Sequence, residues 1–215
     1  DFDATVVKRF ADAGAVLLGK LNLTEGAMAG YNPAFDVPEN PWREGHWSGA
    51  SSSGSGAATA AGMAFATLGS DTGGSIRHPA AVCGTVGLKP TYGRVSRHGV
   101  LDLGQTLDHV GPLTRSAADA GIVMQAISGR DLNDPTTLPN PVPKMLGGVG
   151  RSLKGLKAGW DPVYASADMA PDFAAAVGKA IEVLESLGAE IVPVTMPARL
   201  RVYMAAWQVL CSAEA

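Results

Sequence analysis

Residues 49–79 constrain this chain more than any other segment, because two glycine-rich loops occur there in a fixed order with regular structure between them. The segment reads GASSSGSGAATAAGMAFATLGSDTGGSIRHP, with serines at 51 to 53 and a second loop, SDTGGS, that ends at Ser75. A Gly/Ser run taken alone is typical of a flexible linker. Here a small-residue helix and a strand follow directly, so we interpret the two loops as halves of one folded site.

The composition is that of a folded globular protein. Hydrophobic residues make up 46% of the 215 residues and charged residues 17%, which is too apolar for a disordered chain. The formal net charge of −3, without any basic run, argues against a nucleic-acid-binding surface. Cys83 and Cys211 have neither metal-ligand nor disulfide spacing, so we expect a reducing cytoplasm. No apolar run approaches the ~18 residues of a membrane span, and no signal peptide is recognisable.

Helix and strand patterns alternate along the chain and predict an α/β fold. Asp3 is expected to cap a first helix that Gly14 ends, as capping preferences suggest. The segments expected next are a strand at 15–19, a helix at 54–62, a strand at 63–69, a helix that starts after Thr114 or Ser116 and runs to about residue 127, and a surface excursion at 131–150.

The last third of the chain is the clearest structural unit. A strand at 156–160, a helix that opens at Pro171 and closes at Gly188, and a strand at 190–194 form a βαβ crossover, which requires parallel strands. The residues expected on the inner face of this helix are Phe173, Val177, Ile181, Leu184 and Leu187. We therefore predict a mixed, largely parallel central sheet, covered by helices on both faces and incomplete at both ends.

The familiar serine and phosphate motifs do not fit the two loops. Neither G-x-x-x-x-G-K-[ST] nor G-x-G-x-x-G occurs, which argues against nucleotide binding. The nucleophile elbow G-x-S-x-G also fails, since Ser75 stands in GGSIR. The histidines are scattered, at His46, His78, His98 and His109. The remaining chemistry is a serine activated by a second serine with a lysine as the base, because a desolvated lysine can be neutral near pH 7.

The chain resembles the amidase signature family, which includes the A subunit of glutamyl-tRNA(Gln) amidotransferase. The likeness is densest over the signature core, residues 49–80, where the two key serines lie 24 positions apart as in that family. It continues in GKLNLTE (19–25), NPW (40–42), CGTVGLKPTYGRVSRHGV (83–100) and LDHVGP (107–112). The resemblance implies that residues 1–215 form part of a single amidase domain.

The resemblance also implies a role for each residue of the signature. Ser75 would be the nucleophile that becomes acylated, and Ser51, in a cis peptide after Ala50, would be the bridging serine that relays the proton. Backbone N–H groups of the loop would form the oxyanion hole, and the residues implied are Thr72, Gly73, Gly74 and Ser75. Asp71 and Arg77 would support the loop. No metal and no cofactor is implied.

The family's catalytic lysine has no counterpart in this sequence. It belongs to a segment upstream of GKLNLTE, so neither Lys20 nor Lys89 is assigned to catalysis. Ala50 and Ser53 replace glycines that many relatives carry, and Ser52 and Ser53 are expected to act as hydrogen-bonding scaffold. The sequence starts at Asp1 and ends in WQVLCSAEA, and we expect it to be the central portion of a longer amidase.

Three functions remain open from the sequence. The first is an amidase that hydrolyses a carboxamide to a carboxylate and ammonia. The second is the A subunit of the amidotransferase, which LKPTYGRVSR (88–97) favours and residues 30–56 do not. The third is a catalytically silent or binding protein on the same fold. The expected partner is a small amide substrate, without nucleic acid unless the chain belongs to the amidotransferase; no membrane is expected, and a homodimer stays open.

Overall fold

The computed structural model describes residues 2–28, 30–197 and 200–215. It divides into two compact units. Unit 1 holds the residues up to Gly147 together with Trp207–Ala215, and unit 2 holds Gly148–Ala206. The division falls inside the predicted excursion at 131–150.

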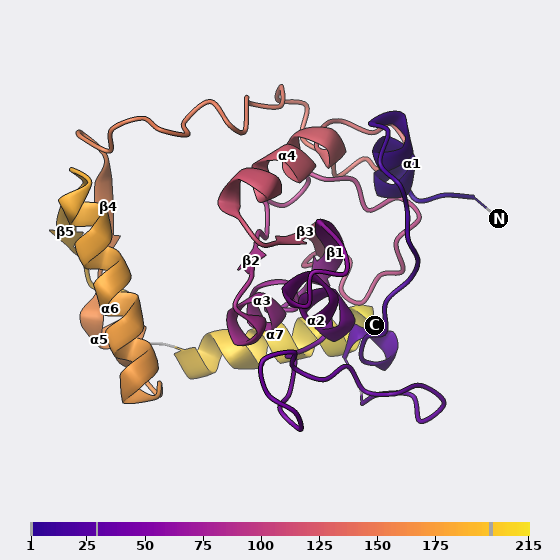
Figure 1. The fold of residues 1–215 in the computed structure, drawn as a ribbon, viewed down its shortest axis with the longest axis horizontal. Helices are drawn as coiled ribbons and strands as arrows, with labels where there is room; N and C mark the ends of the chain where they lie inside the picture. The colour runs from indigo at the N-terminus through magenta and orange to yellow at the C-terminus, as the bar shows by residue number, and fades with distance from the viewer. Residues whose placement is uncertain (1, 29, 198–199) are drawn as a thin grey trace. The chain divides into compact units, whose positions relative to one another are not determined.

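Unit 1 contains the signature loops and most of the helices (Figure 1). Its elements are α1 (Thr5–Asp12), the 3-10 turn η1 (Glu25–Ala27), α2 (Ser53–Ala60), β1 (Ala66–Asp71), α3 (Arg77–Cys83), β2 (Val86–Gly87), β3 (His109–Thr114), α4 (Ala117–Ile127) and the last residues of α7 (Leu200–Glu214).

The sheet of unit 1 has the strand order β1-β3-β2, and both pairs are antiparallel. In Figure 1, α4 lies on one side of β1 and β3, and α2 and α3 lie on the other. Under α4, the buried side chains of Val110, Met124 and Ile127 belong to one hydrophobic cluster. On the opposite side Leu113 joins a second cluster with Ile76, the residue that follows the predicted nucleophile. The sheet therefore anchors the second serine loop through its core.

Unit 2 is the predicted βαβ crossover. Its elements are β4 (Lys157–Trp160), α5 (Pro162–Ser166), α6 (Pro171–Ser186) and β5 (Glu190–Pro193). β4 and β5 pair in parallel, with Ala158 opposite Ile191. Pro171 opens α6 as predicted, and Gly188 follows its end with a φ of +100°. No residue of α6 is fully buried, although an apolar inner face was expected there.

The α/β class is confirmed, but the strand directions differ between the units. Among the described residues, parallel pairing is found in β4 and β5, whereas the sheet that carries the signature loops is antiparallel. β3 begins beside the end at which β1 finishes, with His109 opposite Asp71. β3 therefore has to run back along β1.

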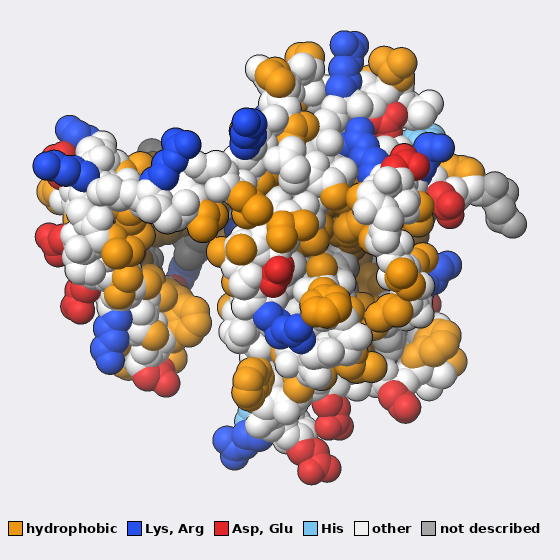
Figure 2. All heavy atoms as spheres, turned by 45° about the horizontal axis from the view of Figure 1, so that its top comes forward, with side chains coloured by type: hydrophobic (Ala, Val, Ile, Leu, Met, Phe, Trp, Pro, Cys, Tyr) orange, Lys and Arg blue, Asp and Glu red, His pale blue; other side chains and the backbone are white. Residues whose placement is uncertain are grey.

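Two local expectations near the N-terminus are wrong. Asp3 does not cap α1, which starts after Ala4 without a side-chain cap hydrogen bond. Residues 15–19 form no strand, and Val16, Leu17 and Leu18 are 82%, 72% and 73% exposed. A strand needs a neighbour to satisfy its backbone groups, and this segment has no strand partner in the described part of the chain. Hydrophobic side chains are also exposed elsewhere on the face drawn in Figure 2.

Hydroxyl groups and glycines let α2 lie close to β1 and α3. Ser55 Oγ donates to Leu68 O at 2.7 Å, and the hydroxyls of Thr59 and Thr67 lie 2.9 Å apart. A Cβ at Gly56 would lie 3.0 Å from the Pro79 side chain, which is tighter than ordinary contact. The small-residue composition of α2 therefore sets how closely the first serine loop approaches the second.

Within the residues that the structure describes, no helix is both long enough and apolar enough to cross a lipid bilayer.

Gly111 offers a test of this packing, because it lies in β3, between β1 and β2. A Cβ at this position would overlap Leu88 O, a backbone atom that cannot rotate away. We expect Gly111→Ala to lower the free energy of unfolding by about 2–3 kcal/mol, measured by denaturant unfolding of the full-length protein. Gly19→Ala is the control, since no atom lies within 4 Å of its Cβ position. Equal stability of the two variants would contradict this packing.

Candidate functional site

The second serine loop runs from the end of β1 to the start of α3, and its ends are held in the protein core. Asp71, the last residue of β1, is 1% exposed, and Ile76 is fully buried against Ala80 and Leu113. Ser75 is half-buried between them. The predicted nucleophile therefore lies on a short loop with two fixed ends.

The Asp71 carboxylate organises the loop from inside. Its Oδ1 accepts the N–H of Gly74 at 2.8 Å, and its Oδ2 accepts the N–H of Ile76 at 3.2 Å. Arg77 makes two side-chain hydrogen bonds to the same carboxylate, at 3.0 and 2.9 Å. Burial alone raises the pKa of Asp71, but the hydrogen bonds and charge of Arg77 and the N–H groups outweigh it and hold the pKa below its ordinary value. Asp71 and Arg77 thus make the contacts expected of loop supports.

The two glycines of the loop are needed for different physical reasons. A Cβ at Gly73 would lie 2.6 Å from the ring of Trp207. Gly74 has a φ of +139°, a conformation that L side chains rarely adopt. The pair therefore cannot be replaced by larger residues without moving the loop.

The N–H groups assigned to the oxyanion hole are not equivalent. The N–H of Gly74 already donates to Asp71. Among the described residues, the N–H groups of Gly73 and Ser75 have no hydrogen-bond acceptor. The carbonyl of Gly74 accepts the N–H of His78 at 2.7 Å. Of the predicted set, the N–H groups of Thr72, Gly73 and Ser75 are thus without an acceptor among the described residues, and Gly73 and Ser75 flank the one that is bonded.

The first serine loop holds Ser51 in a buried position. The peptide bond between Ala50 and Ser51 is cis, as the resemblance implies. Ser51 is 2% exposed, and its Oγ has no hydrogen-bond partner among the described residues. Its carbonyl oxygen accepts the N–H of Ser53 at 2.9 Å.

Ser52 joins the two serine loops. Its N–H donates to Ser75 O at 3.2 Å, and its hydroxyl exchanges 3.3 Å hydrogen bonds with the backbone of Ser70. This is the scaffold role expected for Ser52. The residue next to Ser51 is therefore bonded to the residue proposed as nucleophile.

Two histidines lie near the loops and make structural contacts. His78 Nδ1 accepts the N–H of Ala50 at 3.4 Å, and its ring packs edge-on against Trp47. His109 Nδ1 lies 3.1 Å from Asp71 O. Neither contact involves a serine hydroxyl, which fits the sequence argument against a Ser–His triad.

Neither of the two lysines considered in the sequence is bonded to a signature serine. Lys89 Nζ donates to Pro90 O at 2.9 Å. Burial and then the charge of Arg77 lower the pKa of Lys89, although Asp71 acts in the opposite direction. Lys20 is exposed.

Two supports of the loop were missed by the sequence analysis. Asp108 Oδ1 accepts the hydroxyl of Thr72, and its Oδ2 accepts the N–H groups of Leu103 and Gly104. Trp207 Nε1 donates to Thr72 O at 3.0 Å. Asp108 stood in the LDHVGP motif without an assigned role, and no local pattern connects residue 207 to residue 72.

Comparison with known proteins settles the family. A protein-family model described as Amidase matches residues 1–215. The chain belongs to the amidase family. Over 142 residues it is 57% identical to AmiD of Mycobacterium tuberculosis, an alignment that covers 66% of this chain and 30% of that protein. It is 47% identical to the A subunit of glutamyl-tRNA(Gln) amidotransferase from Akkermansia muciniphila, over 100% of this chain and 46% of that protein.

A solved structure agrees with this family assignment. The crystal structure of the A subunit of glutamyl-tRNA(Gln) amidotransferase from Thermotoga maritima matches with a TM-score of 0.91 and 44% identity, over 100% of this chain and 47% of that chain. The amidase signature fold is thereby confirmed. This amidase-family chain spans less than half the length of each of these relatives.

Asp71→Asn tests the carboxylate at the centre of the loop. Because the pKa of Asp71 is depressed in the folded state, its contribution to stability is full above the unfolded pKa of about 4 and is lost as pH falls through the folded pKa. We expect the variant to lose about 2–3 kcal/mol of unfolding free energy at pH 7, below the loss for a fully buried pair because Arg77 is half-exposed. The difference from wild type should shrink below pH 4 in urea titrations, and a pH-independent difference would contradict it.

Proposed function

We propose that this chain carries the nucleophile and the bridging serine of an amidase that hydrolyses a carboxamide to a carboxylate and ammonia. Ser75 Oγ attacks the amide carbonyl carbon, and its proton passes to Ser51 and on to a lysine outside this chain. The carbonyl oxygen becomes an oxyanion, which the N–H groups of Gly73 and Ser75 stabilise. Return of the proton to nitrogen breaks the C–N bond and releases ammonia, leaving an acyl ester on Ser75. Water then hydrolyses that ester.

The observation that supports this proposal most is the Ser51 hydroxyl. It is buried and lacks a hydrogen-bond partner among the described residues, although an unsatisfied buried polar group costs about 1–3 kcal/mol. The adjacent residue, Ser52, is bonded to Ser75. A buried hydroxyl without a partner among the described residues, on the residue that precedes Ser52, is suited to proton relay between the nucleophile and a third group.

Ser75→Ala tests the nucleophile. The full-length protein that contains this chain is treated with a fluorophosphonate, which reacts with activated serines, and the adduct is located by peptide mass spectrometry. We expect one labelled peptide, containing Ser75, and no label in Ser75→Ala because the attacking oxygen is gone. A wild-type protein that is folded but unlabelled would support the catalytically silent alternative and contradict the proposal.

Ser51→Ala tests the relay. Loss of a positioned proton-transfer group lowers rates by about 10²–10⁴-fold, so we expect acylation to slow by that order while the unfolding midpoint changes little. Ser53→Ala is the matched control, because its hydroxyl makes one weak contact, 3.5 Å to Ser51 O. Full activity of Ser51→Ala would exclude the two-serine mechanism.

His109→Ala separates this mechanism from a triad with histidine as base. We expect the variant to keep most of the wild-type amide hydrolysis rate, because the ring contacts a backbone carbonyl and not a serine. His78→Ala is expected to behave alike. A loss of a thousandfold or more in either variant, with the fold intact, would revive the triad.

A second candidate is the A subunit of an amidotransferase, in which the ammonia passes to a partner protein. This candidate is favoured by the alignments with two amidotransferase A subunits, which cover the whole chain. The purified full-length protein decides between the two. Hydrolysis of simple amides without any partner supports the free-standing amidase, and activity that appears only with added partner proteins supports the amidotransferase.

A further inference from the structure

Helix α7 contacts the nucleophile loop through Trp207. The indole Nε1 donates to Thr72 O at 3.0 Å, and the ring lies where a Cβ of Gly73 would be, 2.6 Å from that position. Trp207 therefore touches the loop twice, once through a hydrogen bond and once through the face left open by a glycine.

The hydrogen bond fixes the direction of one N–H group. Thr72 C=O and Gly73 N–H belong to the same peptide unit, and a trans peptide is planar with its C=O and N–H pointing in opposite directions. Holding Thr72 O on the indole therefore directs the N–H of Gly73 away from Trp207. Gly74 C=O is held in the same way by the N–H of His78, at 2.7 Å, which fixes the N–H of Ser75.

As a result, N–H groups with and without an acceptor alternate along residues 73–75 of the described structure. The N–H groups of Gly73 and Ser75 lack an acceptor among the described residues, and each belongs to a peptide unit whose carbonyl is anchored. The N–H of Gly74, between them, is bound to Asp71. An oxyanion hole gains most from donors that need no reorganisation during the reaction, and two separate anchors supply that here.

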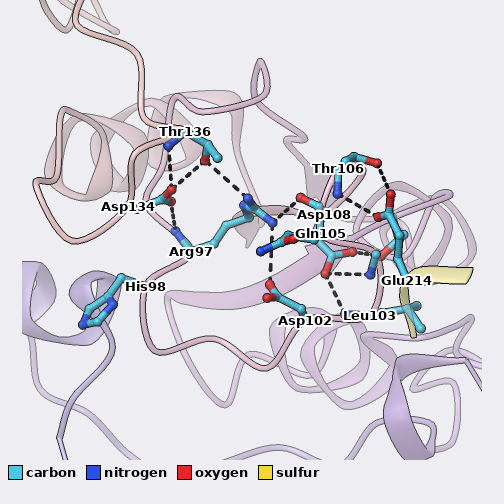
Figure 3. A network of polar contacts seen from close by, with 12 residues as sticks. Arg97, His98, Asp102, Leu103, Gln105, Thr106, Asp108, Asp134, Thr136 and Glu214 are labelled. Carbon is cyan, nitrogen blue, oxygen red and sulfur yellow. Dashed lines mark hydrogen bonds and ion pairs between the residues drawn. The ribbon is translucent and has the colours of Figure 1, made fainter. Parts of the chain in front are cut away.

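The end of α7 is itself tied to the neighbouring loop. Glu214 accepts the N–H of Thr106 at 2.9 Å and its hydroxyl at 2.6 Å, as the dashed lines in Figure 3 mark. Asp108, two residues further along that loop, accepts the hydroxyl of Thr72. Helix α7 and the nucleophile loop are thus joined both directly, at Trp207, and through the loop at 103–108.

We propose that Trp207 is a positioning residue for the oxyanion hole: its indole N–H, bonded to Thr72 O, orients the N–H of Gly73 toward the substrate oxygen. This inference rests on the proposed amidase function. It assigns a role in catalysis to a helix that lies far along the sequence from the signature loops.

Trp207→Phe removes the donor and keeps an aromatic ring over Gly73. In the full-length protein we expect kinact for fluorophosphonate labelling of Ser75 to fall about tenfold, a part of the 10²–10³-fold lost when an oxyanion donor is deleted. KI should change less than twofold, because binding of the probe before reaction does not use the oxyanion hole. Trp42→Phe is the matched control, since Trp42 Nε1 also donates to a backbone carbonyl, Cys83 O, at 2.7 Å.

A second variant guards against misfolding of the first. Gly73→Ala keeps the indole donor but adds a Cβ that would lie 2.6 Å from the Trp207 ring. It should lower kinact because it disturbs the same contact from the side of the loop. Wild-type kinact in Trp207→Phe, or an equal loss in Trp42→Phe, would overturn the positioning role alone. Absence of labelling in the folded wild-type protein would instead overturn the proposed function, and the positioning role with it.

Discussion

The carboxylate of Asp71 is the group on which the geometry of this site depends. It lies at the end of β1, almost without exposure to solvent, and binds two backbone N–H groups of the following loop together with the guanidinium of Arg77. Gly74 donates to it, whereas the neighbouring N–H groups of Gly73 and Ser75 have no acceptor in the part of the chain that the structure describes. A neutral amide at position 71 would keep the size of the side chain but would lose the charge that holds Arg77.

Small residues allow neighbouring segments to pack closely against this loop. Gly73 leaves room for the indole of Trp207, and a Cβ at Gly69 would lie 2.7 Å from Ser52 Oγ. Ser52 in turn bonds to Ser75 O. The glycines and serines that first resemble a linker are therefore contact residues, in which the absence or shortness of a side chain lets one backbone reach another. This is also why the helix that follows the first loop has so few large side chains.

The sequence predicted those features of the fold that depend on residues close together along the chain. Ser116 caps α4 through its hydroxyl, and the crossover between β4 and β5 is parallel as expected. The expected strand at 15–19 failed, because an apolar run becomes a strand only beside a partner. Asp3 was expected to cap the first helix, but α1 has Ala4 at its N-cap position and no side-chain cap hydrogen bond. The two distant supports, Asp108 and Trp207, could not be predicted, since their contacts with Thr72 arise only when separate segments fold together.

We propose that the N–H groups of Gly73 and Ser75, each fixed by its own peptide unit, receive the substrate oxygen. A crystal structure of the full-length protein with a fluorophosphonate adduct on Ser75 would show whether they do. The phosphoryl oxygen should lie about 2.7–3.1 Å from the N–H nitrogens of Gly73 and Ser75, with Gly74 still bonded to Asp71. An oxygen bound instead by the N–H of Gly74, with its bond to Asp71 broken, would contradict it.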